Sequence, residues 1–296
     1  MGREEKKIDV LAVGHALVDI RMIVDRFPGP DEEAEILEES RGSGGSAVNV
    51  SIDVSKLGGR SGIIAKIGFD QFGRIIYEEL WQNKVDMRGL RISPQHPTGF
   101  SIVTIDKAGN IALYSYKGAA ETLTPGEVNP DPIREARVTH IASLRLDTSL
   151  RVAEIVKTTG GIVSWDPGRR LASLGLERTK PLLEKVDIVL LNRNEARLLT
   201  GREPEEAAKI IAEQGPRYVI VKLGAEGSLL YNRVEQRVIH IPPYKPEKIV
   251  DTTGAGDAYA AATLLKIARG EPVEEAVKYG ALIAARKIAR LGAHAI

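Results

Sequence analysis

The stretch VTHIASLRLDTSLRVAEIVKTTGGIVSWD, residues 138–166, decides the fold class. The apolar runs at its two ends indicate buried strands, and the same kind of run returns as DIVLLN at residues 187–192 and YVIVKLG at residues 218–224. Helices are predicted between and after these strands, near residues 149–159, 173–184 and 194–200. Alternation of strands and helices builds a parallel sheet that helices cover on both faces. We therefore predict an α/β fold with three layers, α/β/α, around a mostly parallel central sheet.

The N-terminal part of the chain adds a first strand and a smaller sheet. Residues 8–13 form a run that is apolar apart from Asp9, which is typical of a buried parallel strand. Residues 98–116 predict two alternating strands joined by a glycine-containing turn. Together with an acidic, proline-containing excursion, these strands predict a small β-sheet lid formed by residues 19–41 and 97–117. The whole chain, residues 1–296, is predicted to be one domain.

The composition is that of a globular protein that binds small molecules. The 296 residues are 43% hydrophobic and 27% charged, with a formal net charge of +1. This balance argues against nucleic acid or an anionic membrane as a partner, and no apolar run approaches the ~20 residues of a membrane span. The charged start of the chain is unlike a signal peptide, so we expect a cytoplasmic protein. Abundant Glu, Lys and Arg with little Asn, Gln and Met suggest a thermophilic source.

The absence of cysteine narrows the possible chemistry. Without Cys, the chain has no disulfide, no thiol nucleophile and no Cys-based zinc site. The five His residues are scattered at spacings that do not fit metal ligands. Any bound metal ion must therefore be held by oxygen ligands.

A glycine-rich segment, DTTGAGD at residues 251–257, precedes an alanine-rich run that predicts a helix. The small residues Gly254, Ala255 and Gly256 allow successive backbone N–H groups to converge, and the following helix directs the positive end of its dipole to the same point. This pattern predicts an anion site. Asp257 at the helix start is either a helix cap or a base that takes a proton from an attacking hydroxyl group.

A second glycine-rich segment, GSGGSA at residues 42–47, matches the fingerprint of dinucleotide-binding proteins, but it does not lie where that fingerprint occurs. That fingerprint follows the first strand directly, whereas an acidic excursion intervenes here. A Walker P-loop is excluded because the sequence contains no Gly-Lys pair. Gly44 and Gly45 instead allow close approach of a small ligand, with the amide of Asn49 one helical turn farther on. The alternative is a glycine-rich helix start followed by a solvated Asn.

Four motifs in the right order give the chain an end-to-end resemblance to the PfkB family of ribokinase-like carbohydrate kinases. They are GGSAVNVSIDVSKLGG (44–59) together with IGFDQFG (67–73), then NRNE (192–195), KLGAEG (222–227) and DTTGAGDAY (251–259). Three further segments, GHALVD, KGAAE and WDPGRR, are most similar to archaeal nucleoside kinases of this family. The resemblance implies a ribokinase-like fold and a phosphoryl-transfer reaction.

The resemblance also implies catalytic and nucleotide-binding roles. Asp257 is similar to the family's base on the acceptor hydroxyl group. Gly254, Ala255 and Gly256 would stabilise the transferred phosphoryl group, whose negative charge is balanced by fixed N–H donors. The residues implied to bind the nucleotide, ATP or ADP, are Asn192, Lys222, Gly224, Gly227, Gly254 and Gly256.

Two metal sites follow from the same resemblance. Asn192 and Glu195 would hold a hydrated Mg²⁺ ion, which needs only one or two protein groups. From the residues alone, this pair fits a helix cap and a first-turn Glu equally well. Asp251 and Thr253 match positions that help to hold an activating monovalent cation, such as K⁺, in similar proteins.

The acceptor is expected to bind at Asp19, which we place at the end of the first strand. Asp19 resembles the family's carboxylate that accepts hydrogen bonds from two sugar hydroxyl groups. Gly44, Gly45 and Asn49 would complete this pocket.

Three functions are compatible with these residues. The first is Mg²⁺-dependent transfer of the terminal phosphoryl group of ATP to a primary hydroxyl group of a ribose-type sugar or nucleoside. The second is a kinase for an anionic sugar, either a sugar phosphate or 2-keto-3-deoxygluconate, in which Arg169 and Arg170 pair with the acceptor unless they are merely solvated. The third is a non-catalytic protein that binds a sugar or a nucleotide. An apolar face on the lid further suggests a homodimer.

Overall fold

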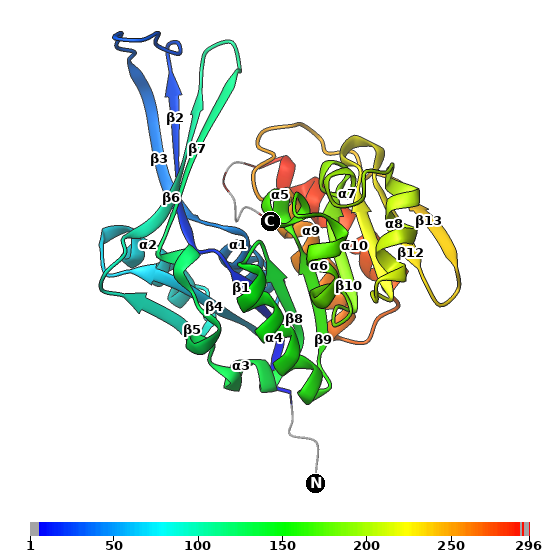
Figure 1. The fold of residues 1–296 in the computed structure, drawn as a ribbon. Coiled ribbons are helices and arrows are strands. Elements are labelled where there is room, and N and C mark those ends of the chain that lie inside the picture. Colours follow the sequence, from blue (N-terminus) through cyan, green and yellow to red (C-terminus); the bar gives the residue numbers. More distant parts are fainter. Residues whose placement is uncertain (1–5, 291, 293–295) are drawn as a thin grey trace.

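The computed structural model describes residues 6–290, 292 and 296, which form two β-sheets and their covering helices (Figure 1). The larger sheet consists of β1 (Ile8–Gly14), β4 (Ser61–Gly68), β5 (Asp86–Ser93), β8 (Ala136–Ala142), β9 (Ile162–Asp166), β10 (Ile188–Asn192), β11 (Tyr218–Lys222), β12 (Ser228–Asn232) and β13 (Arg237–Ile241). Its strand order is β13-β12-β11-β10-β9-β8-β1-β4-β5. The strands from β11 to β5 pair in parallel, and β12 and β13 extend the β11 edge as antiparallel strands.

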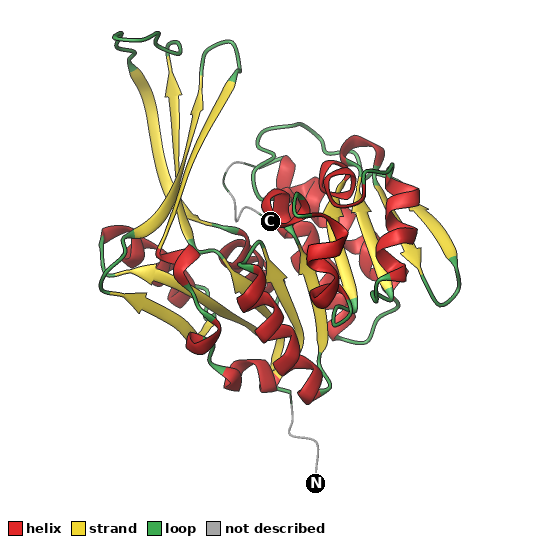
Figure 2. Ribbon diagram, viewed as in Figure 1, coloured by secondary structure: helices red, strands yellow, loops and turns green. Residues whose placement is uncertain are grey.

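Helices cover both faces of this sheet (Figure 2). One face carries α1 (Ser46–Lys56), α2 (Gln71–Gln82), α9 (Ala255–Ala268) and α10 (Val273–Ile288). The other face carries α3 (Pro130–Glu135), α4 (Leu146–Thr159), α5 (Gly168–Ala172), α6 (Gly175–Leu183), α7 (Arg193–Thr200) and α8 (Pro204–Glu213). Short 3₁₀ helices occur at Ala119–Thr122, Pro125–Glu127 and Gly224–Glu226. The predicted three-layer α/β/α fold with a mostly parallel central sheet is therefore confirmed.

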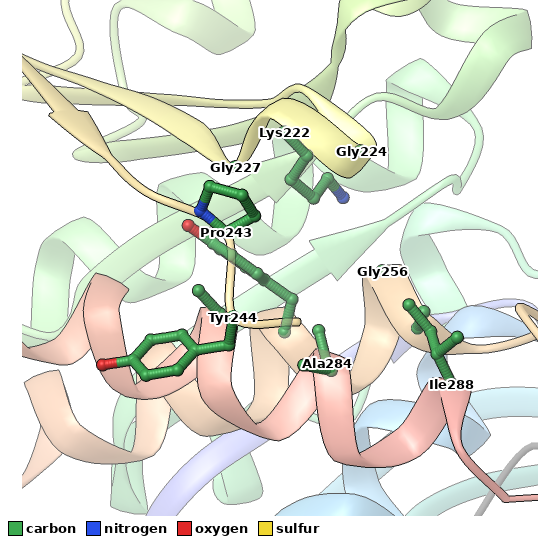
Figure 3. Close-up of a pocket in the computed structure, with 12 residues that line it drawn as sticks. Lys222, Gly224, Gly227, Pro243, Tyr244, Gly256, Ala284 and Ile288 are labelled. Carbon is green, nitrogen blue, oxygen red and sulfur yellow. The ribbon is translucent and has the colours of Figure 1, made fainter. Parts of the chain in front are cut away.

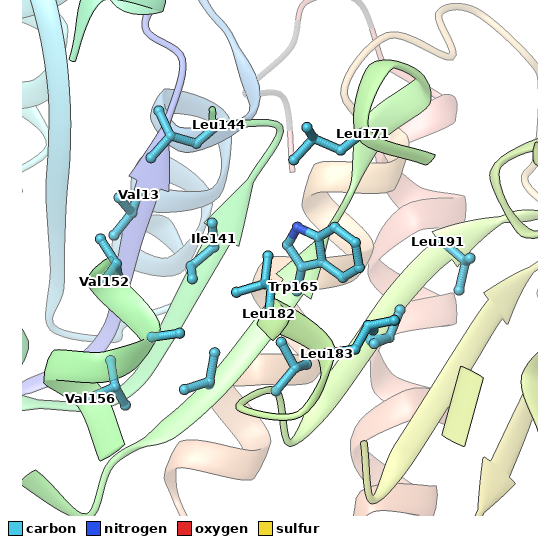
Figure 4. Packing of buried hydrophobic residues seen from close by; sticks show 14 of the residues in the cluster. Val13, Ile141, Leu144, Val152, Val156, Trp165, Leu171, Leu182, Leu183 and Leu191 are labelled. Carbon is cyan, nitrogen blue, oxygen red and sulfur yellow. The ribbon is translucent and has the colours of Figure 1, made fainter. Parts of the chain in front are cut away.

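The central strand β1 shows why these strands are mainly apolar. Leu11 and Val13 pack into the core beneath α3–α8, whereas Val10 and Ala12 pack into the core on the opposite face. Alternate side chains of a strand point to opposite faces, so a strand between two helical layers carries apolar residues on both faces. Asp9 of β1 is the exception, and its carboxylate pairs with Arg60. Trp165 of β9 is fully buried among the aliphatic side chains of the first core (Figure 4).

The smaller sheet projects from the body as a twisted arm (Figure 2). It consists of β2 (Leu17–Val24), β3 (Ile36–Gly44), β6 (Thr98–Ile105) and β7 (Ile111–Gly118), in the order β3-β2-β6-β7. The segments predicted as a lid, 19–41 and 97–117, fall in this sheet; that the sheet closes over a site remains a prediction.

One local prediction was wrong, and one short helix was missed. Asp19 does not end the first strand, because β1 stops at Gly14 and the chain enters β2 after only two residues, which makes Asp19 the third residue of β2. The short helix α5, at Gly168–Ala172, was not predicted, whereas α6 confirms the helix expected near 173–184; Gly175, with a φ of 76°, begins α6. In both places two elements follow each other with only two residues between them.

Candidate active site

The loop before α9 and the first turn of this helix form the predicted anion site. Gly254 precedes the helix with a φ of 74°, a left-handed conformation that favours glycine, and no side chain caps the helix. The N–H groups of a first helical turn have no acceptors within the helix. Ala255 N donates to Thr252 O at 3.2 Å; the N–H groups of Gly256 and Asp257 can bind an anion, and the helix dipole adds to the attraction.

Asp257 is the third residue of α9 and is not its cap. Its Oδ2 accepts a hydrogen bond from Asn49 Nδ2 of α1 at 2.7 Å. Loss of solvent raises the pKa of Asp257, as do the nearby charges of Asp166 and Asp53, whereas the Asn49 hydrogen bond and Lys222 act in the opposite direction. A carboxylate with a raised pKa is a stronger acceptor for a hydroxyl proton. The geometry excludes the helix cap, and the role of base stays a prediction.

Lys222, the last residue of β11, directs its ammonium group toward the anion site. Its Nζ lies 3.0 Å from Asp166 Oδ2 and 3.4 Å from the position that a Cβ atom on Gly256 would occupy. Burial would lower the pKa of Lys222, but the carboxylates of Asp166, Glu195 and Asp257 raise it above its ordinary value. A positive charge is thus held beside the first turn of α9.

Asp166 is a site residue that the sequence analysis missed. It ends β9, and the neighbouring strands β10 and β11 end at Asn192 and Lys222, which are register partners. Ligands of open α/β sheets bind at the carboxyl ends of parallel strands. The signal that would have identified Asp166 is therefore its position as the polar last residue of a predicted buried strand.

Asn192 and Glu195 form the capping box that was one of the two interpretations of this pair. Asn192 Oδ1 accepts from Glu195 N at 2.9 Å, and Glu195 Oε2 accepts from Asn192 N at 2.8 Å. Burial and the charge of Asp166 raise the pKa of Glu195 to about 7, against the effects of Lys222 and the capping hydrogen bonds. The capping box involves Oε2 only, so it is compatible with a further role for Oε1.

The carboxylates of Glu195 and Asp166 fit a Mg²⁺ ion. Within the described residues, no three His, Cys, Asp or Glu side chains are grouped so that they could hold a metal ion by themselves. Mg²⁺ keeps several water ligands and binds through one or two carboxylates together with substrate phosphates. Repulsion between Asp166 and Glu195 contributes to the raised pKa of Glu195, and a divalent cation would relieve this repulsion.

Two cavities flank the loop 251–256. The smaller, of about 180 Å³, is lined by residues that include Lys222, Gly224, Gly227, Tyr244, Gly256 and Ile288 (Figure 3). The larger, of about 440 Å³, is lined by residues that include Asp19, Arg21, Arg41, Ser43, Asp251 and Thr253. Most of the predicted nucleotide residues therefore meet at one cavity, and the predicted acceptor carboxylate lies at the other.

The predicted acceptor residues come together where β3 leads into α1. A Cβ atom on Gly44 would lie 2.1 Å from Asp19 Oδ2, so only glycine leaves room for this carboxylate. Gly45 has a φ of 87° and packs against the main chain that connects β1 with β2. Asn49 is 4% exposed and donates to Asp257, so the alternative of a solvated Asn is wrong.

Arg169 and Arg170 do not line either cavity. Both are exposed residues of α5, and Arg170 forms an ion pair with Glu121. Glu121 also binds His15 Nε2 at 3.1 Å. Burial would raise the pKa of Glu121, but the hydrogen bonds from His15 and Arg170 hold it below its ordinary value. Arg170 therefore already has an anionic partner within the protein.

His140 lies under the site and should make stability depend on pH. It is 1% exposed, and burial lowers its pKa from 6.5 to about 4. Between these values the unfolded chain binds more protons than the folded one, so the free energy of unfolding rises with pH, by about 3 kcal/mol across the window. We expect His140→Gln to flatten this rise in thermal denaturation. His96→Gln, at an exposed position, is the control, and equal slopes for His140→Gln and wild type would contradict the assignment.

Comparison with known proteins supports a kinase. The family model described as pfkB family carbohydrate kinase matches residues 7–296. The chain is 32% identical to the ATP-dependent ribose-1-phosphate kinase of Halopiger xanaduensis, over 96% of this chain and 94% of that protein. Two solved structures, each matched over 97% of this chain and 94% of theirs, are similar. They are Arabidopsis thaliana ribokinase complexed with ribose and ATP (TM-score 0.86, 25% identity) and Methanocaldococcus jannaschii nucleoside kinase (TM-score 0.85, 28% identity). With its fold, its motifs and these similarities, the chain belongs to the PfkB family of carbohydrate kinases.

Proposed function

We propose that the protein is a cytoplasmic, Mg²⁺-dependent kinase that transfers the terminal phosphoryl group of ATP to a primary hydroxyl group of a ribose-type sugar or nucleoside. The observation that carries this proposal is the position of Asp257, in the first turn of α9 at the anion site and hydrogen-bonded to Asn49. The loop before it lies between two cavities. A donor in one and an acceptor in the other would both reach this turn.

In the proposed reaction the acceptor oxygen attacks the γ-phosphorus of ATP, its proton passes to Asp257, and the bond from this phosphorus to ADP breaks. Main-chain N–H groups of the anion site and the ammonium group of Lys222 would stabilise the negative charge that spreads over the transferred group. Mg²⁺ bound by Glu195 and Asp166 would neutralise charge on the nucleotide phosphates. Asn192 would orient Glu195 through the capping box.

A ribose-type acceptor is supported by Asp19 and by the relatives. The carboxylate of Asp19 lines the larger cavity and can accept hydrogen bonds from two neighbouring hydroxyl groups. By their names, the Halopiger protein acts on ribose 1-phosphate and the Methanocaldococcus protein on a nucleoside, and the Arabidopsis structure holds ribose with ATP. These ligands share a pentose.

A phosphorylated sugar is the second candidate, because two arginines line the same cavity as Asp19. Arg21 lies on β2 and Arg41 on β3. Arg21 Nε is buried and has no hydrogen-bond partner among the described residues. Guanidinium groups recognise phosphate through paired hydrogen bonds. Arg41 pairs with Glu39, so support for an anionic acceptor comes mainly from Arg21 rather than from Arg169 and Arg170.

A coupled phosphorylation screen tests the proposal. Purified protein is incubated with Mg²⁺ and either ATP or ADP, and with nucleosides, ribose, ribose 1-phosphate, fructose, fructose phosphates or 2-keto-3-deoxygluconate. Preference for ribose or a nucleoside supports the first candidate. Preference for ribose 1-phosphate, with a raised KM in Arg21→Ala but not in Arg170→Ala, supports the second. Absence of turnover with every acceptor, while ATP still binds, would refute the kinase and leave a binding protein.

We also propose that two copies associate through the smaller sheet. Ile111 and Leu113 of β7 are 66% and 65% exposed, and clustered exposed apolar side chains mark interfaces. Light scattering should show a dimer for the wild type and a monomer with unchanged Tm for Leu113→Asp. Val234→Asp, at an equally exposed position in the β12–β13 turn, should stay dimeric. A wild type that is monomeric at all concentrations would contradict this proposal.

A further inference from the structure

Lys287 of α10 is a buried charge next to Asp251, where the loop to the predicted anion site begins. Its side chain is 0% exposed, and its Nζ lies 3.4 Å from the main-chain oxygen of Asp251. A buried ammonium group persists only where negative charge or carbonyl oxygens replace its water. Burial lowers the pKa of Lys287, and the carboxylates of Asp251 and Asp53 oppose that shift. The carboxylates and the main-chain oxygen around Asp251 therefore stabilise the buried ammonium group of Lys287.

The same end of α10 also holds the main chain that leads into the anion site. Val250 N and Asp251 N both donate to Ile288 O, at 2.8 and 3.2 Å. The Asp251 carboxylate accepts from Thr253 N through Oδ1 at 2.9 Å and from Gly292 N through Oδ2 at 3.1 Å. The loop that presents the anion site is thus attached to α10 immediately beside the ammonium group.

A monovalent cation at Asp251 and Thr253 does not fit beside this ammonium group. Such an ion would bind carboxylate and main-chain oxygens, and the main-chain oxygen of Asp251 already faces Lys287. Two unit positive charges a few ångström apart repel each other strongly where little water screens them. The chain carries a covalently attached cation beside Asp251, one of the two residues at which the resemblance predicts an exchangeable cation.

We infer that Lys287 replaces the monovalent cation and holds the loop 251–254 in its anion-binding conformation, so that activity does not depend on K⁺. The ammonium group has the same unit charge as K⁺ and donates to oxygens of the kind that would coordinate the ion. Lys287 is a positioning residue, because it contacts the loop and not the reacting atoms. Only the kinetic part of this inference rests on the proposed function.

The first part of the test compares wild-type protein in KCl, NaCl and tetramethylammonium chloride at equal ionic strength. We expect the same kcat and the same Tm in all three salts, although the tetramethylammonium ion is too large to enter a K⁺ site. A saturable rise in kcat or in Tm that is specific for K⁺ would overturn the inference.

The second part removes the charge. Lys287→Ala should lower kcat by about tenfold or more in tetramethylammonium chloride, with a smaller effect on the KM of the acceptor. KCl should restore part of the kcat and raise the Tm of this variant specifically. Lys287→Arg keeps the charge and should stay active in every salt. Lys278→Ala removes a lysine from the same helix that is ion-paired at the surface with Glu274 and Glu275, and should behave like wild type.

The outcomes separate this inference from the proposed function. The salt dependence of Tm needs no turnover, so a wild type that is silent with every acceptor refutes the proposed function alone. Identical responses of wild type and Lys287→Ala to the three salts refute the inference alone. If Lys287→Ala does not fold, Lys287→Met fills the volume without the charge. Wild-type kcat and Tm for Lys287→Met in tetramethylammonium chloride would then also refute it.

Discussion

An Asp257→Asn variant is expected to phosphorylate the acceptor about 10²–10⁴ times more slowly than the wild type and to bind ATP as tightly. Asn has nearly the same shape as Asp and can still accept the hydrogen bond from Asn49, so the first turn of α9 keeps its geometry. Its neutral amide, however, does not take up the proton of the hydroxyl group. Steady-state kcat and calorimetric titration with ATP in the absence of acceptor measure the two effects separately.

The matched control for this variant is Asp131→Asn. Asp131 lies in α3 with a side chain that is 61% exposed, and its change should leave kcat and ATP affinity unaltered. An unchanged kcat in Asp257→Asn would refute the role of Asp257 as the base. A loss of ATP affinity as large as the loss of kcat would instead identify Asp257 as a nucleotide-binding group.

Lys222→Met is expected to lower kcat by about 10²–10³, the effect of removing one fixed positive group from a phosphoryl-transfer site. The variant also removes the charge that holds down the pKa of Asp257, so that this pKa rises further. A base must be deprotonated to act, so the acidic limb of the pH–rate profile should move to higher pH. Measurement of kcat across the pH range tests both statements.

Lys209→Met is the control, because it removes a lysine that lies outside the candidate site. Lys209 is an exposed residue of α8 that pairs with Glu205, and its replacement should change neither kcat nor the pH profile. If Lys222→Met showed wild-type kcat and an unmoved acidic limb, the ammonium group would have only a structural role. A raised KM for ATP with unchanged kcat would show that the ammonium group of Lys222 contributes to ATP binding and not to the stability of the transition state.

Much of the fold could be predicted because its strongest features are local. The strands β1, β9, β10 and β11 are short and mainly apolar, since helices cover both sides of the sheet. The start of β2 was less predictable, because only two residues separate it from β1. The sequence pattern therefore did not show that Asp19 belongs to a second strand.

The candidate site likewise has one part that could be predicted from the local sequence and one part that could not. The glycines before Asp257 and the pair Asn192 and Glu195 are recognisable because each group lies within a few residues of one helix start. Asp166 acts with Lys222, 56 positions farther on, and Arg170 with Glu121, 49 positions earlier. A single Asp or Arg has no local pattern that names such a partner, so these contacts emerge only when the strands are assembled.

The hydrogen bond between Asn49 and Asp257 joins two helices, α1 and α9, whose contributing residues are 208 positions apart. A ribosome releases α1 long before α9, and a domain completes its folding only when all of its parts are present. Asp257 can meet its partner only after most of the chain has been synthesised. A nascent or truncated polypeptide that ends before residue 249 would therefore lack Asp257 as well as the wall of the larger cavity that Asp251 and Thr253 form, and the recovery of turnover during refolding would report the docking of the last two helices.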